Sequence, residues 1–190
     1  MVIPLAPPTI LARLRAETRP YHDAIEQNEF NQAVAAGSPS VAATARFLAK
    51  MYGFLVPYEA QLRQHAAALG PAWEIPARQR AHLILADLHV AAAELPLCPA
   101  MPPLATLPQL LGAMYVVEGS TLGGQVLARQ LAKSNIDYTT YFTGYGDQTG
   151  PRWKTFCQLL EAAATPATAA AIVQSASETF QHLASWLTRP

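Results

Sequence analysis

The stretch LGAMYVVEGSTLGGQVLARQL, residues 111–131, has the composition of one long apolar helix that carries glycines at its centre. Gly119, Gly123 and Gly124 fall within six consecutive positions. Each glycine inside a helix destabilises it by about 1 kcal/mol relative to alanine. Two physical needs explain such a cluster: close packing of a neighbouring helix against the backbone, or close approach of a flat ligand. The segment alone is compatible with both.

The composition predicts a single all-α domain. The chain has 190 residues, of which 51% are hydrophobic and only 14% are charged, so it can bury a substantial core. Alanine and leucine are abundant, and prolines separate periodic segments, which is typical of helical proteins. We therefore expect one domain over residues 1–190, with residues 1–8 as a flexible N-terminal segment.

Charge and cysteine content exclude several classes of protein. Thirteen basic residues balance 13 acidic ones and no basic block stands out, so we expect no nucleic-acid partner. Cys98 and Cys157 are far apart and form no CxxC pair, so we expect two structural thiols. The N-terminus lacks the pattern of a signal peptide, and no stretch has the apolar length of a membrane span. We expect a cytoplasmic protein without membrane contact.

Capping and breaking residues divide the chain into helices. Ser40 is expected to cap a long helix, and Gly37 to end the short helix before it. Pro20 predicts a kink or restart in the first helix, and Pro57 predicts a bend in the long one. Residues 137–151 are expected to form a loop rich in tyrosine and glycine. The expected helices cover residues 9–28, 29–36, 40–69, 76–94, 107–134, 151–164 and 166–187.

Four side chains are expected to follow one face of the first helix, because their spacings are four, three and four residues. They are Arg15, Arg19, His22 and Glu26. A histidine with a carboxylate one turn later suits metal ligation, because the acid holds one ring N–H and fixes the tautomer. The arginines offer positive charge to an anionic ligand. The alternative is a surface helix on which Arg19 pairs with Asp23 and His22 is half buried.

The segment that carries His22 and the segment that carries the glycine cluster together resemble a known family. LRAETRPYHDAIEQNEF (14–30) and YVVEGSTLGGQVLARQL (115–131) resemble the proximal and distal helices of haem oxygenases, especially the bacterial enzymes. YFTGYGDQTGPRWKTF (141–156) resembles the loop and helix that follow. The resemblance runs from about Leu11 to the last helix. It implies a helical bundle in which haem is sandwiched between a proximal helix and a kinked distal helix.

The resemblance also implies roles for residues of the first helix. His22 matches the axial ligand of the haem iron, and Glu26 matches the acid that hydrogen-bonds the histidine ring. Arg15 and Arg19 stand where the family places basic residues near the haem propionates. Further haem contacts are implied for Tyr115, Arg152 and Lys154.

On the distal helix, Gly119, Gly123 and Gly124 match glycines whose backbone lies over the haem face. Two positions depart from the mammalian-type pattern. Ser120 stands where those enzymes carry an aspartate that organises water around bound oxygen, so Ser120 and ordered water are the candidates for proton delivery. Gln158 stands where they carry a propionate-binding arginine.

A haem oxygenase uses haem as both substrate and cofactor. The resemblance implies that dioxygen is reduced at the iron, that a meso carbon of the porphyrin is oxidised, and that biliverdin, carbon monoxide and ferrous iron are released. The electrons come from a separate donor, a ferredoxin or a reductase, because the chain has no GxGxxG fingerprint for flavin or nicotinamide. The purpose is either chromophore supply to a bilin-binding photoreceptor or recovery of iron from haem.

Two alternatives stay open: a non-catalytic haem-binding or haem-sensing protein of the same fold, and a helical scaffold whose glycines serve packing. A di-iron carboxylate site is not expected, because the chain has no ExxH motif. Glu118, beside Gly119, is expected to be structural or solvent-facing, since charged residues are seldom fully buried. The remaining histidines lack comparable partners and are expected to be core or surface residues: His65, His82, His89 and His182.

Overall fold

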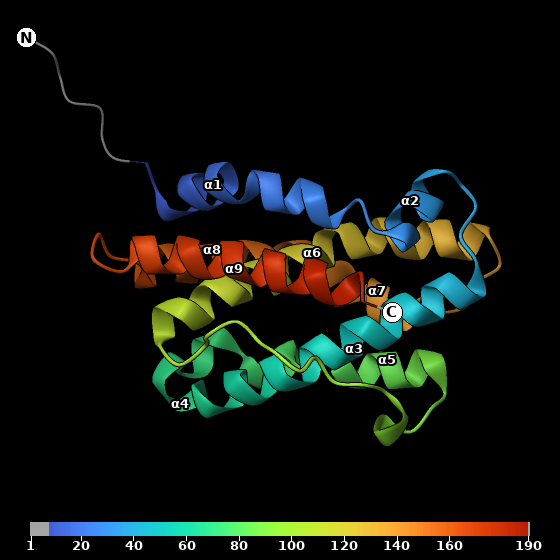
Figure 1. Cartoon of the computed structure of the whole chain (residues 1–190). Helices are drawn as coiled ribbons and strands as arrows, with labels where there is room; N and C mark the ends of the chain where they lie inside the picture. The colour runs from blue at the N-terminus through green and yellow to red at the C-terminus, as the bar shows by residue number, and fades with distance from the viewer. Residues whose placement is uncertain (1–7, 190) are drawn as a thin grey trace, which may run out of the picture.

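The structure of the chain is a computed structural model that describes residues 8–189. Within this range the regular elements are helical, as the sequence predicts (Figure 1). The flexible segment expected over residues 1–8 lies outside the described residues, apart from residue 8.

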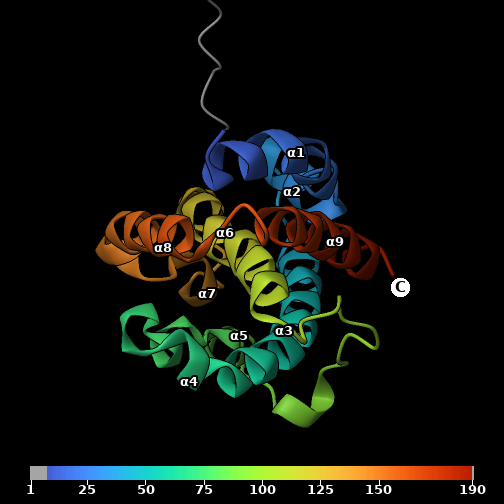
Figure 2. The ribbon, with the colours of Figure 1, turned by 90° about the vertical axis from the view of Figure 1, so that its left-hand side faces the viewer.

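The α-helices stack in three layers. Their bounds are α1 Ile10–Ile25, α2 Glu29–Ala35, α3 Val41–Gln64, α4 Ala66–Leu69, α5 Ala81–Leu88, α6 Leu107–Lys133, α7 Thr140–Thr143, α8 Thr149–Ala163 and α9 Ala169–Leu187. α1 and α2 form one outer layer, α6, α8 and α9 the middle layer, and α3, α4 and α5 the other outer layer (Figures 1 and 2). α1 packs on α9 and α8, while α6 packs on α9, α8 and α7. α9 therefore supports both the first helix and the glycine helix.

Polar side chains start the long helices. The Ser40 hydroxyl accepts a hydrogen bond from a first-turn N–H of α3 at 3.1 Å, which confirms the predicted cap. Thr9 caps α1 in the same way at 3.2 Å, and Thr106 forms a capping box with Gln109 at the start of α6. Each cap stabilises its helix by about 1 kcal/mol, because it satisfies an N–H group that the helix cannot.

Several boundaries differ from the prediction. α1 continues through Pro20, so the predicted restart is not found, and α3 continues through Pro57. The helix expected to reach residue 69 is divided at His65 into α3 and α4. Residues 137–151, expected to be a loop, contain α7 and the 3-10 helix η4, Gly146–Gln148.

The single helix expected over residues 76–94 is wrong, because α5 covers only part of it. The 3-10 helices η2, Ile75–Arg78, and η3, Ala92–Glu94, take up its two ends. The buried Glu59 carboxylate of α3 accepts the N–H groups of Arg80 and Ala81 at 2.6 and 2.8 Å, so it caps α5 from a distance. His89 ends the helix in the left-handed conformation at φ 55°.

The position of α6 is fixed by packing along its buried side. Leu110, Ala113 and Met114 are fully buried. A Cβ atom at Gly112 would collide with the backbone carbonyl of Ile172, so this glycine allows α9 to cross at close range. Close packing of α9 therefore accounts for Gly112, a glycine of the segment quoted above that lies outside the central cluster.

α7 is tied to the layer below it through Asp87 of α5. The two carboxylate oxygens of Asp87 accept the N–H groups of Thr140 and Tyr141, each at 2.9 Å. These are charge-assisted bonds made by a buried side chain, so they hold α7 firmly beneath the middle of α6.

Candidate functional site

The three central glycines of α6 have different surroundings. A Cβ atom at Gly123 would meet no described atom within 4 Å, and one at Gly119 would make an ordinary contact with the Trp153 ring at 3.5 Å. A Cβ atom at Gly124 would lie 2.6 Å from the carbonyl oxygen of Phe142 in α7, which is too close. Gly124 therefore serves close packing, whereas Gly123 lies on an open side of the helix.

This open side of α6 is apolar. Leu122 and Val126 are 42% and 49% exposed, although most large apolar side chains of the chain are buried. Gly123 and Ser120 are exposed beside them. Bare backbone bordered by exposed aliphatic side chains suits contact with an apolar partner, because covering it removes apolar area from water.

The charged residue in the middle of α6 is turned into the protein. Glu118 is 1% exposed and accepts a bond from Arg78 Nη1 at 2.6 Å, and the Tyr145 hydroxyl lies 3.2 Å from both of its carboxylate oxygens. Burial, together with the negative charge of Glu118, raises the pKa of Tyr145 to about 12. Glu118 is thus structural, and the expectation that it could face solvent is wrong. Residues 114–126 contain no other charged side chain.

The predicted line of side chains on α1 is exposed along its length, with Arg15, Arg19, His22 and Glu26 all accessible. His22 Nδ1 lies 3.7 Å from Glu26 Oε1 and 3.7 Å from Asp23 Oδ1. These distances exceed hydrogen-bonding range, so a Glu26–His22 hydrogen bond stays a prediction. Arg19 Nε pairs with Asp23 at 2.9 Å, as the surface-helix alternative expects, but such an exposed pair contributes little to stability.

The side chains of His22, Asp23 and Glu26 form a group that could hold a cation, because their ligand atoms all lie within 4.8 Å of one another. All three residues are exposed. The His22 ring also meets the ring of Phe180 in α9 edge-on, with centroids 5.8 Å apart. α9 thus supports one side of the imidazole, and the rest of the ring stays accessible.

Aromatic side chains lie at one end of the open side of α6. The ring of Trp153 in α8 is 5.6 Å from that of Tyr115 in α6 and borders Gly119. Burial raises the pKa of Tyr115, and the nearby positive charge of Arg15 opposes that rise. The structure therefore brings Arg15 of α1 close to the aromatic end of the glycine helix.

The two basic residues predicted on α8 have different environments. Arg152 lies over the Tyr145 ring at 4.8 Å, and its Nη2 is 3.6 Å from Glu74 Oε2. The first contact places Arg152 beside Tyr145, whose hydroxyl lies next to Glu118. Lys154 is exposed, as is Gln158 one turn later. Of the two basic residues, Lys154 is the more accessible to a ligand.

Comparison with known proteins identifies the family of the chain. The family model described as Heme oxygenase matches residues 9–189. The chain belongs to the haem oxygenase family. A heme oxygenase of Xanthomonas campestris is 31% identical over 134 residues, which cover 68% of this chain and 79% of that protein. As a haem oxygenase, the chain is an enzyme of haem degradation, and the non-catalytic and scaffold alternatives are not supported.

Solved structures of haem oxygenases share the fold. The heme oxygenase of Leptospira interrogans superposes with a TM-score of 0.81 at 18% identity, covering 95% of this chain and 99% of that one. Heme oxygenase-1 of the cyanobacterium Synechocystis, solved in complex with heme, gives 0.77 at 19% identity and covers 95% and 91%. At these identities the likeness shows a common fold.

Sequence reasoning did not identify Arg78, Arg80 and Tyr145 as neighbours of the haem oxygenase glycine helix. They come from η2, the start of α5 and the loop before η4, and they surround Glu118. The available signal was Glu118 itself, a lone acid between Val117 and Gly119 in an apolar helix. Such an acid must find a buried partner, but the pattern does not say where.

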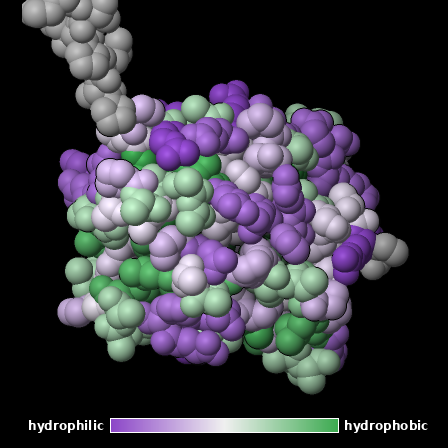
Figure 3. Space-filling view, turned by 60° about the vertical axis from the view of Figure 1, so that its left-hand side comes forward, coloured by the Kyte–Doolittle hydropathy of each residue, from purple (hydrophilic) through white to green (hydrophobic). Residues whose placement is uncertain are grey.

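The surface of this haem oxygenase is mixed in character. On the face shown in Figure 3, hydrophilic side chains alternate with separate apolar patches. Across residues 8–189, none of the helices has both the length and the apolar character needed to cross a membrane.

Proposed function

We propose that this haem oxygenase binds haem between α1 and α6, with His22 as the axial ligand of the iron, and cleaves it to biliverdin, carbon monoxide and ferrous iron. The open side of α6 at Gly123 is the observation that carries the proposal. A bare backbone there lets a flat ligand approach closely, and Leu122 and Val126 offer it apolar contacts.

The residues of α1 fit haem by their chemistry. Imidazole is a common ligand of haem iron, and the His22 side chain is 51% exposed and therefore accessible. Glu26, one turn later, is placed to accept a ring N–H and so to fix the tautomer. Arg15 and Arg19, with Lys154 of α8, supply positive charge for the propionate carboxylates.

Bound haem supplies both the iron that reduces dioxygen and the porphyrin carbon that is oxidised. The task of the chain is to leave oxygen able to reach that carbon. A charged acid or base beside the iron would promote competing chemistry, and the only charged side chain of residues 114–126 is buried against Arg78. Ser120 offers a single hydroxyl on the ligand side, and Gly119 and Gly123 provide steric control by backbone alone.

The wider role of the enzyme is also a proposal. A separate donor, a ferredoxin or a reductase, supplies the electrons in the cytoplasm. The biliverdin supplies a bilin-binding photoreceptor, or the reaction recovers iron. Assay with each class of donor, and identification of the genes that are expressed together with this one, separates these roles.

Titration of the purified protein with hemin tests the binding proposal. We expect the visible spectrum of a nitrogen-ligated haem, and its loss in the variant His22→Ala. The matched control is His82→Ala, which removes an exposed imidazole from α5 on the opposite side of the molecule. Equal spectra for the two variants would rule out His22 as the ligand.

Turnover tests the reaction. With dioxygen and an electron donor, the haem absorption should give way to that of biliverdin, and carbon monoxide should be released. Gly123→Leu fills the open side of α6, so it should block or redirect ring cleavage while His22 still binds iron. Wild-type cleavage rate and product in this variant would contradict the role given to the bare backbone.

A further inference from the structure

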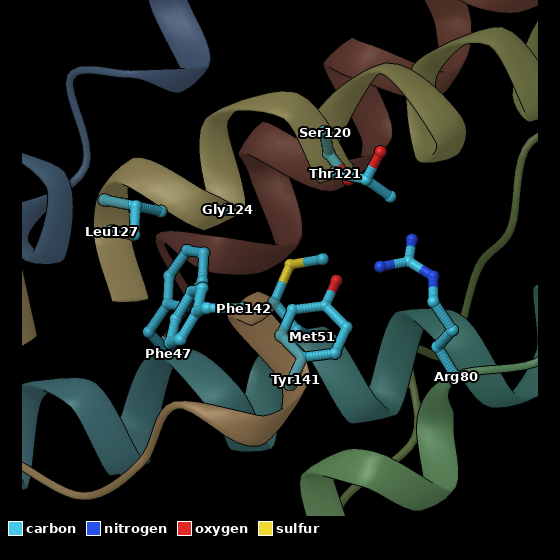
Figure 4. Close-up of a pocket in the computed structure, with 9 residues that line it drawn as sticks. All are labelled: Phe47, Met51, Arg80, Ser120, Thr121, Gly124, Leu127, Tyr141 and Phe142. Atoms are coloured by element: carbon cyan, nitrogen blue, oxygen red, sulfur yellow. The ribbon is translucent and has the colours of Figure 1, made fainter. Parts of the chain in front are cut away.

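A histidine and two carboxylates lie together at the C-terminal end of α1. Among residues 8–189, His22, Asp23 and Glu26 are the one group of three potential metal ligands whose ligand atoms all lie within 4.8 Å of one another. Glu26 is the C-cap of the helix, and the dipole of a helix favours positive charge at this end. The cavity that α6 forms with α3 and α7 offers no such group, because its charged lining residue is Arg80, itself a cation (Figure 4). A metal ion is therefore better accommodated on α1 than in this cavity.

The distances within this group are close to those of a metal coordination shell. His22 Nδ1 lies 3.7 Å from Asp23 Oδ1 and 3.7 Å from Glu26 Oε1. Zinc binds nitrogen and oxygen ligands at about 2.0–2.2 Å, so two ligands of one tetrahedral ion lie about 3.4 Å apart. The nitrogen and each of these oxygens therefore need to approach by only about 0.3 Å to share an ion. All three side chains are exposed, so they have room for this adjustment, and water completes the coordination.

Neighbouring side chains orient two of the three ligands. Arg19 Nε donates to both carboxylate oxygens of Asp23, at 2.9 and 3.0 Å. A carboxylate has about four lone-pair sites, so Asp23 can still bind an ion, and ligating carboxylates are commonly held by such a second partner. Phe180 of α9 supports the imidazole of His22 edge-on, with ring centroids 5.8 Å apart. Imidazole favours transition-metal ions over Mg²⁺ and Ca²⁺, and two carboxylates balance a double positive charge. The ligand class is therefore a divalent transition-metal ion.

The ring nitrogen that faces the two acids decides how such an ion affects haem. A neutral imidazole has one N–H and one nitrogen with a free lone pair. In the proposed haem complex Glu26 accepts the Nδ1–H of His22, so Nε2 carries the lone pair that binds the iron. An ion held between Nδ1 and the two acids uses the lone pair of Nδ1 instead. The proton then lies on Nε2, and this nitrogen can no longer bind iron. The ion and haem thus require opposite tautomers of the same ring.

We propose that His22, Asp23 and Glu26 bind a divalent transition-metal ion in the haem-free enzyme, and that this ion and haem exclude each other. The exclusion rests on the proposed function, whereas binding of the ion concerns the haem-free protein alone. The ferrous iron that ring cleavage releases belongs to the same class of ion. Iron that stays on these three ligands therefore delays the binding of the next haem.

Calorimetric titration of the haem-free protein with Zn²⁺ tests binding of the ion. The variant Asp23→Asn should bind Zn²⁺ about tenfold or more weakly than the wild type, because loss of a hydrogen-bonding partner of a ligand alone costs about 10–100-fold. Glu17→Gln is the matched control, since Glu17 is an exposed acid of α1 that pairs with Arg13 at 2.8 Å in the same i,i+4 arrangement. It should bind Zn²⁺ as the wild type does. The metal site is overturned if the wild type binds no Zn²⁺, or if the two variants bind it equally well.

Hemin titration at increasing Zn²⁺ concentrations tests the exclusion. The apparent Kd of hemin for the wild type should rise in proportion to the Zn²⁺ concentration once this exceeds the Kd of the ion. Asp23→Asn keeps His22 and Glu26, so it should give the wild-type haem spectrum and need more Zn²⁺ for the same rise. Unchanged hemin affinity in wild-type protein saturated with Zn²⁺ would overturn the exclusion. If His22→Ala keeps the spectrum of the nitrogen-ligated complex, the proposed function itself has failed, and the calorimetric titration still decides the metal site separately.

Discussion

Replacing Gly123 with alanine separates the two roles that glycine can have in α6. The residue is exposed and lies inside a long helix, and beyond the nearby backbone of α6 itself no described atom is within 4 Å of the position that a methyl group would take there. The methyl group therefore improves helix propensity without a clash. We expect the haem-free protein to gain about 1 kcal/mol of stability, which raises the Tm of a chain of this size by about 2–4 °C.

Gly124→Ala provides the contrast one position further along the helix. Its methyl group would lie 2.6 Å from the carbonyl oxygen of Phe142, and α7 has little freedom to retreat because Asp87 holds it. Overpacking of this kind costs about 1–3 kcal/mol, which outweighs the same gain in propensity. We expect this variant to be less stable by up to about 2 kcal/mol.

Thermal and chemical denaturation of the haem-free variants measure these differences, and hemin titration then measures the ligand's response. Gly123→Ala should weaken haem binding or alter its spectrum although the protein is more stable. Gly124→Ala, measured at a temperature at which the variant is folded, should affect haem binding less than Gly123→Ala does. A lower Tm for Gly123→Ala would refute the open environment assigned to this position. If Gly123→Ala is more stable but binds and cleaves haem as the wild type does, the proposed contact between Gly123 and the ligand is refuted.

Three other substitutions probe the buried polar groups. Glu118→Gln leaves the Arg78 guanidinium buried without its counter-charge and should destabilise the protein by about 3–5 kcal/mol in urea denaturation. The control is Glu29→Gln, which breaks the exposed pair with Arg46 and should change stability by less than about 1 kcal/mol. Equal effects of the two substitutions would contradict the burial of the Arg78–Glu118 pair. Burial raises the pKa of Glu59 above its unfolded value, so its contribution to stability is present at low pH and lost as pH rises through the folded pKa. Glu59→Gln should flatten that decline in a pH series of denaturation midpoints, and an unchanged slope would show that another group causes it. Asp87→Asn leaves one acceptor oxygen for two N–H groups of α7, so it should lower the free energy of unfolding by about 1–3 kcal/mol in urea denaturation. Wild-type stability in this variant would mean that water replaces the lost hydrogen bond.

Features set by neighbours in the chain could be predicted from the sequence. Ser40 caps α3 because the cap depends on residues within one turn, and the start of α6 was placed correctly from the apolar period. The common face of Arg15, Arg19, His22 and Glu26 on α1 follows from their spacing, whereas its exposure is seen only in the structure. The beginning of α5 could not be found in this way, since the acid that caps it, Glu59, lies more than 20 residues earlier in the chain.

In the candidate site too, features set by neighbours in the chain could be predicted, whereas contacts between distant residues could not. His22 and Gly123 could be proposed from the sequence because each belongs to a local pattern that resembles the family, and their roles stay predictions. The partner of Glu118 is 40 residues away, and the groups around Arg80 come from different helices, so only the folded chain brings them together. Equally, the sequence does not distinguish Gly123 from Gly124, because the difference lies in what stands opposite each one.

This difference bears on how descendants of such a chain would change if they lost the enzymatic activity. Selection at position 123 would then relax, and a side chain there would even favour folding. Position 124 would remain restricted to glycine as long as the carbonyl of Phe142 lies against it. A homologue with a larger residue at the position of Gly123 and glycine at the position of Gly124 would be a candidate for a protein that has kept the fold but lost the enzymatic activity.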